Sequence, residues 1–301
     1  MINGTVQQSH TKNLKVAVVG AGGRLGAALV REYAARHEVI GFTHAQLDLA
    51  RLPLLRETLE PLAFDVLINS AALTNVDYCE DHREEAMLLN AEAPQLLAEI
   101  CRQKGSRFVH VSTDYVFDGE KRAPYSEEDP VKPISVYGES KRAGEIQVLE
   151  ANDRALVIRV SWVFGPDRPS FVDAILKKAR TEEQVAAVSD KFSTPTYTPD
   201  IAAMLEPLLQ LSTANGILHL ANRGECSWQE YAQWALDCCH RFGVPMQAKT
   251  VGAVSLGEMT NFVARRPIYT VLGTEKYARL ADQAPRDWHD AVADYVRDYY
   301  R

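Results

Sequence analysis

The chain has 301 residues, of which 46% are hydrophobic and 24% charged, as is ordinary for a globular protein. Its net charge of −7 argues against a nucleic-acid partner, and no apolar run reaches the roughly 20 residues that span a bilayer. This length allows two domains.

The first half of the chain alternates apolar strands with helical segments. Residues 1–13 precede it, are polar, lack the apolar core of a secretory signal, and are expected to form a flexible extension. Continuous apolar runs are typical of parallel strands buried on both faces. The pattern therefore predicts an α/β fold, a Rossmann-like doubly wound parallel sheet over 14–165. Strands are expected at 14–19, 38–42, 65–69, 107–112 and 155–161, and helices at 25–37, 52–62, 83–105 and 138–149.

After Val163 this rhythm changes, and prolines interrupt the chain. Ser227 and Glu230 have the spacing of a capping box at the start of a helix. We expect a smaller, mixed α/β C-terminal domain over 166–301 that mainly binds the substrate, with part of 190–225 returning to the first domain. Its helices are expected at 170–180, 228–242 and 287–300, and a strand at 185–189.

The five cysteines form no C-x-x-C pair, so the sequence predicts neither a metal site nor a disulfide framework. This usage fits a reducing compartment and favours the cytoplasm.

The first strand runs into a glycine-rich turn with the spacing G-x-x-G-x-x-G, through Gly20, Gly23 and Gly26. In such a turn one glycine makes the bend, one lets the backbone approach a pyrophosphate, and one lets helix and strand pack closely. The helix N-terminus offers free N–H groups to phosphate. The alternative is a strand–helix turn that binds nothing, but the first βα turn of a doubly wound sheet favours a dinucleotide site.

The second strand ends in GFTHAQ, and no carboxylate precedes Asp48 to hold a ribose 2′-hydroxyl. Arg24, within the glycine turn, is a candidate for a 2′-phosphate, with a solvated loop cation as the alternative. The sequence therefore favours NADPH as cofactor, with NADH usable.

Tyr137 and Lys141 lie four residues apart in a predicted helix, and so on one face of it. A tyrosine donates a proton to a carbonyl oxygen best when its pKa approaches the working pH. We expect the Lys141 cation to lower the pKa of Tyr137, and Gly138 to leave room for a substrate ring. Two unrelated surface side chains are the alternative.

Ser112 and Thr113 end a central strand, where open α/β folds bind ligands. Either hydroxyl could hydrogen-bond the same carbonyl oxygen as Tyr137. A strand alternates faces, so only one of the two should point into the site, and the sequence does not choose between them.

Together these features resemble the extended short-chain dehydrogenase/reductase superfamily. Further motifs in order, from Lys15 to the C-terminal helix, narrow the resemblance to the dTDP-4-dehydrorhamnose reductase family. They are NSAALTNVDYCE (69–80), VSTDYVFDG (111–119), PISVYGESKRAGE (133–145), IRVSWVFG (158–165), STPTYTPDIA (193–202), GILHLANRGECSWQEYA (216–232) and ARRPIYTVL (264–272).

The resemblance implies an NAD(P)H-dependent reductase that acts on the 4-keto group of a nucleotide-linked deoxysugar, and it allows a homodimer. The catalytic residues it implies are Thr113, Tyr137 and Lys141. For the cofactor it implies Gly20, Gly23, Arg24, Leu25, Gly26, Asp48, Leu49, Asn69, Ala71 and Ala72, together with Tyr137 and Lys141. For the substrate it implies Thr74, Val76, Asp114, Trp162 and Arg266, although core packing would explain Trp162 and a surface ion pair Arg266.

Two departures from the family pattern lie in the substrate half. Pro169 and Ser170 stand where polar amides are expected before Phe171, and Lys191 replaces a glutamine. They leave the hydride chemistry intact and the sugar nucleotide open. Two other functions fit the sequence: another sugar-nucleotide reductase or epimerase, and a non-catalytic NADP-binding subunit like the regulatory subunit of methionine adenosyltransferase.

Overall fold

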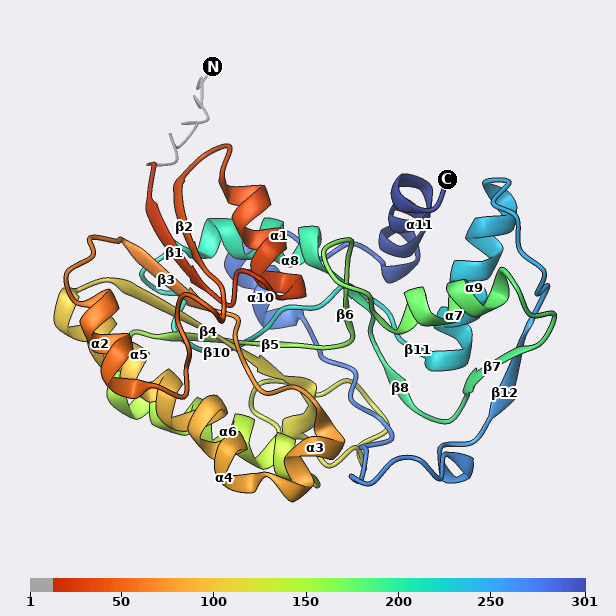
Figure 1. Cartoon of the computed structure of the whole chain (residues 1–301), viewed down its shortest axis with the longest axis horizontal. Coiled ribbons are helices and arrows are strands. Elements are labelled where there is room, and N and C mark those ends of the chain that lie inside the picture. The colour runs from red at the N-terminus through yellow and green to blue at the C-terminus, as the bar shows by residue number, and fades with distance from the viewer. Residues whose placement is uncertain (1–12) are drawn as a thin grey trace, which may run out of the picture.

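The computed structural model describes residues 13–301, so the expected extension over 1–13 lies almost wholly outside the described residues. A six-stranded parallel sheet forms the centre of the larger half of the molecule, in the order β10-β5-β4-β3-β1-β2 (Figure 1). Its strands are β1 (Lys15–Val19), β2 (Glu38–Phe42), β3 (Val66–Asn69), β4 (Arg107–Thr113), β5 (Leu156–Val160) and β10 (Gly216–His219). The predicted doubly wound parallel sheet is confirmed.

Helices cover both faces of this sheet (Figure 1). The apolar stripe of each helix packs against the continuous apolar strands, as the sequence pattern predicts. One face carries α1 (Arg24–Tyr33), α8 (Thr198–Leu205) and α10 (Glu275–Ala281), and the other carries α2 (Leu52–Leu59), α5 (Ala93–Lys104) and α6 (Val136–Ala151).

The helix expected over 83–105 is divided in three. It begins as α4 (Arg83–Met87), passes through the π-helical turn η1 (Leu88–Glu92), and continues as α5. A preceding short helix, α3 (Val76–Asp81), was not expected. A π-helical turn inside a helix is frequent at functional sites, because the extra residue re-aims the side chains around it.

The smaller half has its own apolar core, formed by α7 (Phe171–Ala179), α9 (Trp228–Arg241) and α11 (Trp288–Tyr299). The predicted capping box at Ser227 and Glu230 is present and starts α9. The strand expected at 185–189 is β7. Three two-stranded sheets border this core, pairing β7 (Val185–Val188) with β12 (Val251–Val254), β8 (Phe192–Ser193) with β11 (Cys226–Ser227), and β6 (Val163–Phe164) with β9 (Thr196–Tyr197).

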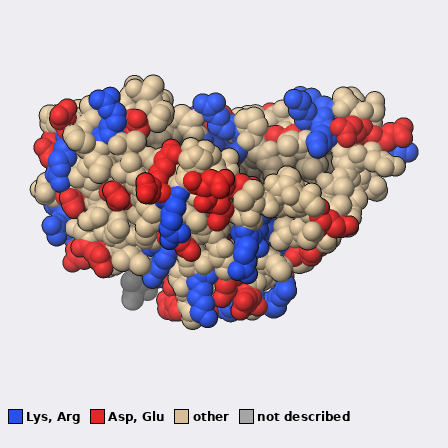
Figure 2. Space-filling view, turned by 60° about the horizontal axis from the view of Figure 1, so that its bottom comes forward, with Lys and Arg blue, Asp and Glu red and all other residues tan. Residues whose placement is uncertain are grey.

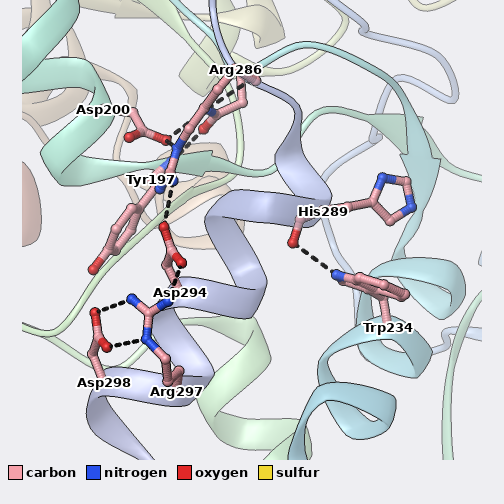
Figure 3. Close-up of polar contacts among 9 residues, drawn as sticks. Tyr197, Asp200, Trp234, Arg286, His289, Asp294, Arg297 and Asp298 are labelled. Atoms are coloured by element: carbon pink, nitrogen blue, oxygen red, sulfur yellow. Dashed lines mark hydrogen bonds and ion pairs between the residues drawn. The ribbon is translucent and has the colours of Figure 1, made fainter. Parts of the chain in front are cut away.

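Arg286 ties α11 to helix α8 of the larger half (Figure 3). Its Nε lies 2.7 Å from Asp200 Oδ2, and its second ion pair, to Asp294, spans 2.5 Å. Trp234 of α9 donates from Nε1 to the carbonyl oxygen of His289, 2.9 Å away. These contacts fix the C-terminal helix against both halves.

Acidic and basic side chains are interspersed over the face of the molecule seen in Figure 2. Over residues 13–301, no helix is both long and apolar enough to cross a membrane.

Candidate active site

A cavity of about 890 Å³ opens at the carboxyl ends of the central strands. It brings together segments that are far apart in the chain: the glycine turn, the loop after β3, the end of β4, the start of α6 and the segment after β5. Its walls include Gly20, Gly23, Arg24, Leu25, Leu49, Ala71, Ala72, Thr74, Val76, Thr113, Asp114, Tyr137, Lys141 and Trp162.

The glycine turn needs its glycines for steric reasons. Gly20 has a φ of +86°, and a Cβ there would lie 2.7 Å from the amide nitrogen of Ala71. A Cβ on Gly26 would overlap the carbonyl oxygen of Gly20 and lie 2.7 Å from Ser70 Oγ. The N-cap of α1, Gly23, offers no side-chain cap, so the first N–H groups of this helix are left for an anion. The turn therefore fits a dinucleotide pyrophosphate.

Three residues that the resemblance assigns to the cofactor, Gly26, Asp48 and Asn69, are not among those that line the cavity. Asn69 Oδ1 accepts a hydrogen bond of 3.1 Å from the amide of Ala71, and so orders a loop that does line it. Residues beyond β2 were missed, although their place directly after the second strand could have indicated them. They are Thr43, His44, Ala45 and Leu47.

Arg24 lines the cavity, but its guanidinium binds backbone of the same chain, a contact that the sequence did not predict. Its nitrogens donate to three carbonyl oxygens of the segment after β5, those of Val163, Arg168 and Pro169, the first two over 3.1 Å. Three of its five N–H groups are thus paired with backbone and hold its guanidinium against this segment, so the expected role on a 2′-phosphate stays a prediction for the remaining two.

The structure distinguishes the two hydroxyls at the end of β4. Ser112 also lines the cavity, but its Oγ donates to Glu145 Oε1 over 2.7 Å, in a buried pair. Glu145 in turn forms a buried ion pair with Arg159, also of 2.7 Å. Thr113, the next residue, faces the other side of the strand, lies close enough to Tyr137 to influence its pKa, and donates from Oγ1 to Asp114 Oδ1 over 3.1 Å. Strand alternation thus places the Thr113 hydroxyl beside the tyrosine.

Tyr137 and Lys141 both lie on the buried side of α6, which starts at the cap Ser135, whose Oγ accepts from the amide of Gly138 over 3.2 Å. Burial raises the pKa of Tyr137 above its ordinary value, and the neighbouring Thr113 hydroxyl opposes this shift. Lys141 is not among the groups that shift it, so the expected lowering of the Tyr137 pKa by Lys141 is not what this structure shows. The Lys141 ammonium instead donates to the carbonyl oxygen of Val111 over 2.7 Å.

Burial also lowers the pKa of Lys141, to about 8, and the charge of Glu145 partly offsets this effect. Desolvation disfavours a cation and an anion alike, which is why the pKa of the lysine falls while that of the tyrosine rises.

The role expected for Gly138 is wrong. A Cβ at this position would overlap the carbonyl oxygen of Tyr115 and lie 2.9 Å from Pro133 Cβ. The glycine lets α6 approach the backbone that follows β4, and leaves no room for a ligand.

Asn90, in the π-helical turn, supports two segments of the site by hydrogen bonds, and the sequence did not indicate this role. Its Nδ2 donates to Ser140 Oγ over 2.9 Å and to the carbonyl oxygen of Leu73 over 3.0 Å, and its Oδ1 accepts from the Leu73 amide. It therefore joins α6 to the loop that carries Thr74.

On the substrate side, Thr74, Val76 and Trp162 line the cavity. Trp162 has a φ of +38°, a conformation that is strained for a bulky residue, and its buried Nε1 has no hydrogen-bond partner among residues 13–301. Strain of this kind persists where surrounding contacts enforce it, often at a ligand site. Its ring packs near those of Trp228 and Tyr231, so Trp162 is both a core residue and a wall of the cavity.

Asp114 and Lys191 form part of a buried polar cluster. Burial raises the pKa of Asp114, while the Lys191 charge is the largest influence lowering it. The Asp114 carboxylate accepts from Thr270 Oγ1 over 2.5 Å, and Lys191 Nζ donates to the carbonyl oxygen of Pro267 over 2.5 Å. Lys191, the substitution within the family motif, therefore holds the Pro267 segment in place rather than lining the cavity.

Arg266 is not brought to the cavity wall. Its guanidinium forms a two-pronged ion pair with Asp77 of α3, and lies 3.7 Å from the centre of the Phe262 ring. The guanidinium thus joins the two halves of the molecule, and the expected substrate contact of Arg266 stays a prediction.

Comparison with known proteins gives the same family as the motifs. A family model described as the RmlD substrate binding domain matches residues 14–301. The spore coat polysaccharide biosynthesis protein SpsK of Bacillus subtilis is 36% identical over 94% of this chain and 97% of its own. A dTDP-4-dehydrorhamnose reductase of Burkholderia thailandensis is 35% identical over 95% and 99%. The crystal structure of dTDP-4-dehydrorhamnose reductase from Bacillus anthracis, in complex with NADP, has a TM-score of 0.88 at 29% identity, covering 94% of this chain and 98% of that one.

The parallel sheet, the glycine turn and the Thr113–Tyr137–Lys141 arrangement together define the extended short-chain dehydrogenase/reductase class. Within that class, the chain belongs to the dTDP-4-dehydrorhamnose reductase family.

Proposed function

We propose that the protein is an NADPH-dependent ketoreductase that reduces the 4-keto group of a dTDP-linked 6-deoxysugar, with dTDP-4-dehydrorhamnose as its substrate. One observation carries the proposal. A single cavity holds both a glycine turn suited to a dinucleotide and the hydroxyl–tyrosine–lysine set suited to a carbonyl. The family relatives named as reductases of this sugar, and the NADP held by a similar structure, support the choice of substrate and cofactor.

Tyr137 is the proton donor in this mechanism. Because burial raises the pKa of Tyr137, its hydroxyl stays protonated at neutral pH and is available to the carbonyl oxygen. Thr113 lies beside this hydroxyl at the same cavity, and its own hydroxyl donates to Asp114 Oδ1 over 3.1 Å. As negative charge develops on the carbonyl oxygen, the Tyr137 hydroxyl stabilises it, and Thr113 adds a second donor when its proton turns from Asp114 to that oxygen.

Lys141 supplies positive charge beneath the tyrosine. One of its three N–H groups donates to Val111, which leaves two for a cofactor ribose. NADPH, when bound, supplies the hydride to the carbonyl carbon. The glycine turn, Leu25 and Leu49 would hold its phosphates and adenosine portion, and Ala71 and Ala72 would line its path to the substrate.

Trp162, Thr74 and Val76 form the substrate side of this proposal, since they line the cavity beyond the catalytic hydroxyls. Asp114 contributes by orienting the Thr113 hydroxyl, which donates to Asp114 Oδ1 over 3.1 Å.

The experiment is to follow the oxidation of NADPH with dTDP-4-keto-6-deoxysugars, and to compare Tyr137→Phe. Removing the proton donor should lower kcat by roughly 10²- to 10⁴-fold while NADPH still binds. Unchanged turnover in Tyr137→Phe would contradict the mechanism. Cofactor binding by the wild type without turnover on any such sugar would favour a binding subunit instead.

A further inference from the structure

The loop between β6 and α7 and the glycine turn exchange hydrogen bonds in both directions. Arg24 Nε donates to the carbonyl oxygen of Arg168 over 3.1 Å, and Arg168 Nε donates to the carbonyl oxygen of Gly22 over 2.9 Å. An ion pair between Arg31 and Asp167 joins the same two segments farther along α1. Arg168 is therefore held through both its backbone and its side chain.

Three lysine or arginine side chains line the cavity, and they differ in how their donors are used. Lys141 Nζ donates to Val111, and all three nitrogens of the Arg24 guanidinium donate to carbonyl oxygens. Arg168 uses only Nε, and nothing in the described part of the chain accepts from its two terminal nitrogens. A guanidinium carries five N–H donors, so four of those of Arg168 are left for a ligand.

The position of Arg168 beside the N-terminus of α1 indicates which ligand these donors would bind. Its partner Gly22 directly precedes Gly23, the N-cap of α1, where the helix leaves uncapped N–H groups. In this fold the pyrophosphate of a dinucleotide sits at that helix N-terminus. A guanidinium matches a phosphate with two parallel N–H bonds. We propose that Arg168 binds the pyrophosphate of the dinucleotide, an assignment that rests on the proposed function for the identity of the ligand.

The loop that carries Arg168 is held at both ends by contacts within the protein. It leads into α7 through a capping box, in which the amide and the hydroxyl of Ser170 both donate to Asp173 Oδ2 over 2.6 Å. Its other end is joined to α1 by Arg24. Because these contacts position the guanidinium in advance, less conformational entropy is lost when a phosphate binds.

Direct binding measurements test this assignment without requiring turnover, so they stay interpretable if the proposed ketoreductase activity is not found. NADPH, NADH and ADP-ribose are titrated by calorimetry into the wild type, Arg168→Gln and Arg168→Lys. All three ligands contain the pyrophosphate, and only NADPH carries the 2′-phosphate. Arg168→Gln should raise Kd roughly tenfold to a hundredfold for all three, and Arg168→Lys should recover part of the loss.

Arg31→Gln is the matched control, because it removes an ion pair of the same loop at a residue that does not line the cavity. It should change Kd by no more than about twofold, as for an exposed pair. Equal losses of affinity in Arg31→Gln and Arg168→Gln would overturn the proposal, because they would show that both residues act only by holding the loop in place. A loss confined to NADPH would assign Arg168 to the 2′-phosphate, and unchanged Kd values would leave it a solvent-exposed cation.

Discussion

Asp77 and Arg266 form a two-pronged ion pair, with Arg266 Nη1 3.0 Å from Asp77 Oδ1 and Nη2 2.6 Å from Oδ2. Asp77 Oδ1 also accepts from the amides of Val263 and Ala264, each over 2.8 Å. One carboxylate of α3 thus holds the 263–266 segment of the smaller half. Because α3 starts at Val76, which lines the cavity, this ion pair lies next to the proposed substrate site.

Asp77→Asn should destabilise the protein by about 1–2 kcal/mol at pH 7, because the charged hydrogen bonds are weakened. The hydrogen bond with Arg266 lowers the pKa of Asp77 from 3.8 to about 2. Since the folded-state pKa lies below the ordinary value, this stabilisation is fully present above pH 3.8 and is lost as the pH falls through 2. Urea unfolding of both proteins at several pH values measures it. A stability difference that does not shrink with acid would contradict the argument.

Thr113→Val and Ser112→Ala should differ in their effect on kcat, although the two residues are adjacent. Thr113→Val removes the hydroxyl beside Tyr137 and should lower kcat by roughly 10²-fold, and it should also cost about 1 kcal/mol of stability because this hydroxyl bonds Asp114 and the Tyr115 amide. Ser112→Ala removes a buried hydrogen bond to Glu145 and should cost about 1 kcal/mol of stability with kcat retained. Steady-state kinetics and thermal unfolding of both variants check this. A larger loss of kcat in Ser112→Ala would reverse the assignment.

Deprotonation of Lys141 should limit activity on the alkaline side. Burial lowers the pKa of Lys141 to about 8, so its positive charge is present below pH 8 and is lost above it. We expect kcat/KM for NADPH to fall as the pH rises through about 8. Lys141→Arg should shift this alkaline fall of kcat/KM (the alkaline limb of the pH profile) to higher pH, because arginine stays charged.

Lys191 provides the control for that experiment, since burial lowers its pKa to about 8 as well. Lys191→Met should leave the alkaline limb in place. If Lys191→Met removes the limb and Lys141→Arg does not move it, the titrating group is Lys191.

Gly26→Ala and Gly22→Ala test the steric argument for the glycine turn. A Cβ on Gly26 would overlap backbone, whereas a Cβ on Gly22 would meet nothing nearer than Thr43 Cγ2, at 3.6 Å. Gly26→Ala should therefore cost about 1–3 kcal/mol, as overpacking does, and lower Tm by several degrees. Gly22→Ala should leave Tm within about a degree of the wild type. Equal Tm values for the two variants would contradict the close approach.

The central sheet could be predicted because its strands are buried on both faces and therefore appear as continuous apolar runs. The edge strand β10 could not be placed by such a run. Its pattern is short, and its position depends on pairing with β5, which precedes it by some 60 residues. The π-helical turn around Asn90 was equally hidden, because the apolar periodicity of 83–105 fits one helix.

The residues of the candidate site likewise fall into those that the sequence could predict and those that it could not. Gly20, Tyr137 and Lys141 were predictable because their chemistry depends on local spacing and on the end of a strand. Arg24 and Arg266 were given ligands because each cation was considered without its neighbours. Their actual partners are separated from them by 139 to 189 residues, and only the tertiary fold brings those carbonyl oxygens and that carboxylate into range.

Strand β10 has a further consequence for how the molecule can be divided. The chain leaves the central sheet after β5, builds part of the smaller half, and comes back with α8 and β10 before leaving again. A fragment ending near residue 165 would lack both elements, leaving the backbone groups of β5 exposed along one edge and the apolar side of α1 uncovered. Such an edge invites pairing between molecules. The nucleotide-binding half is thus compact in three dimensions but is not formed by one continuous segment of the chain. A fragment ending near residue 165 should therefore aggregate when it is expressed alone.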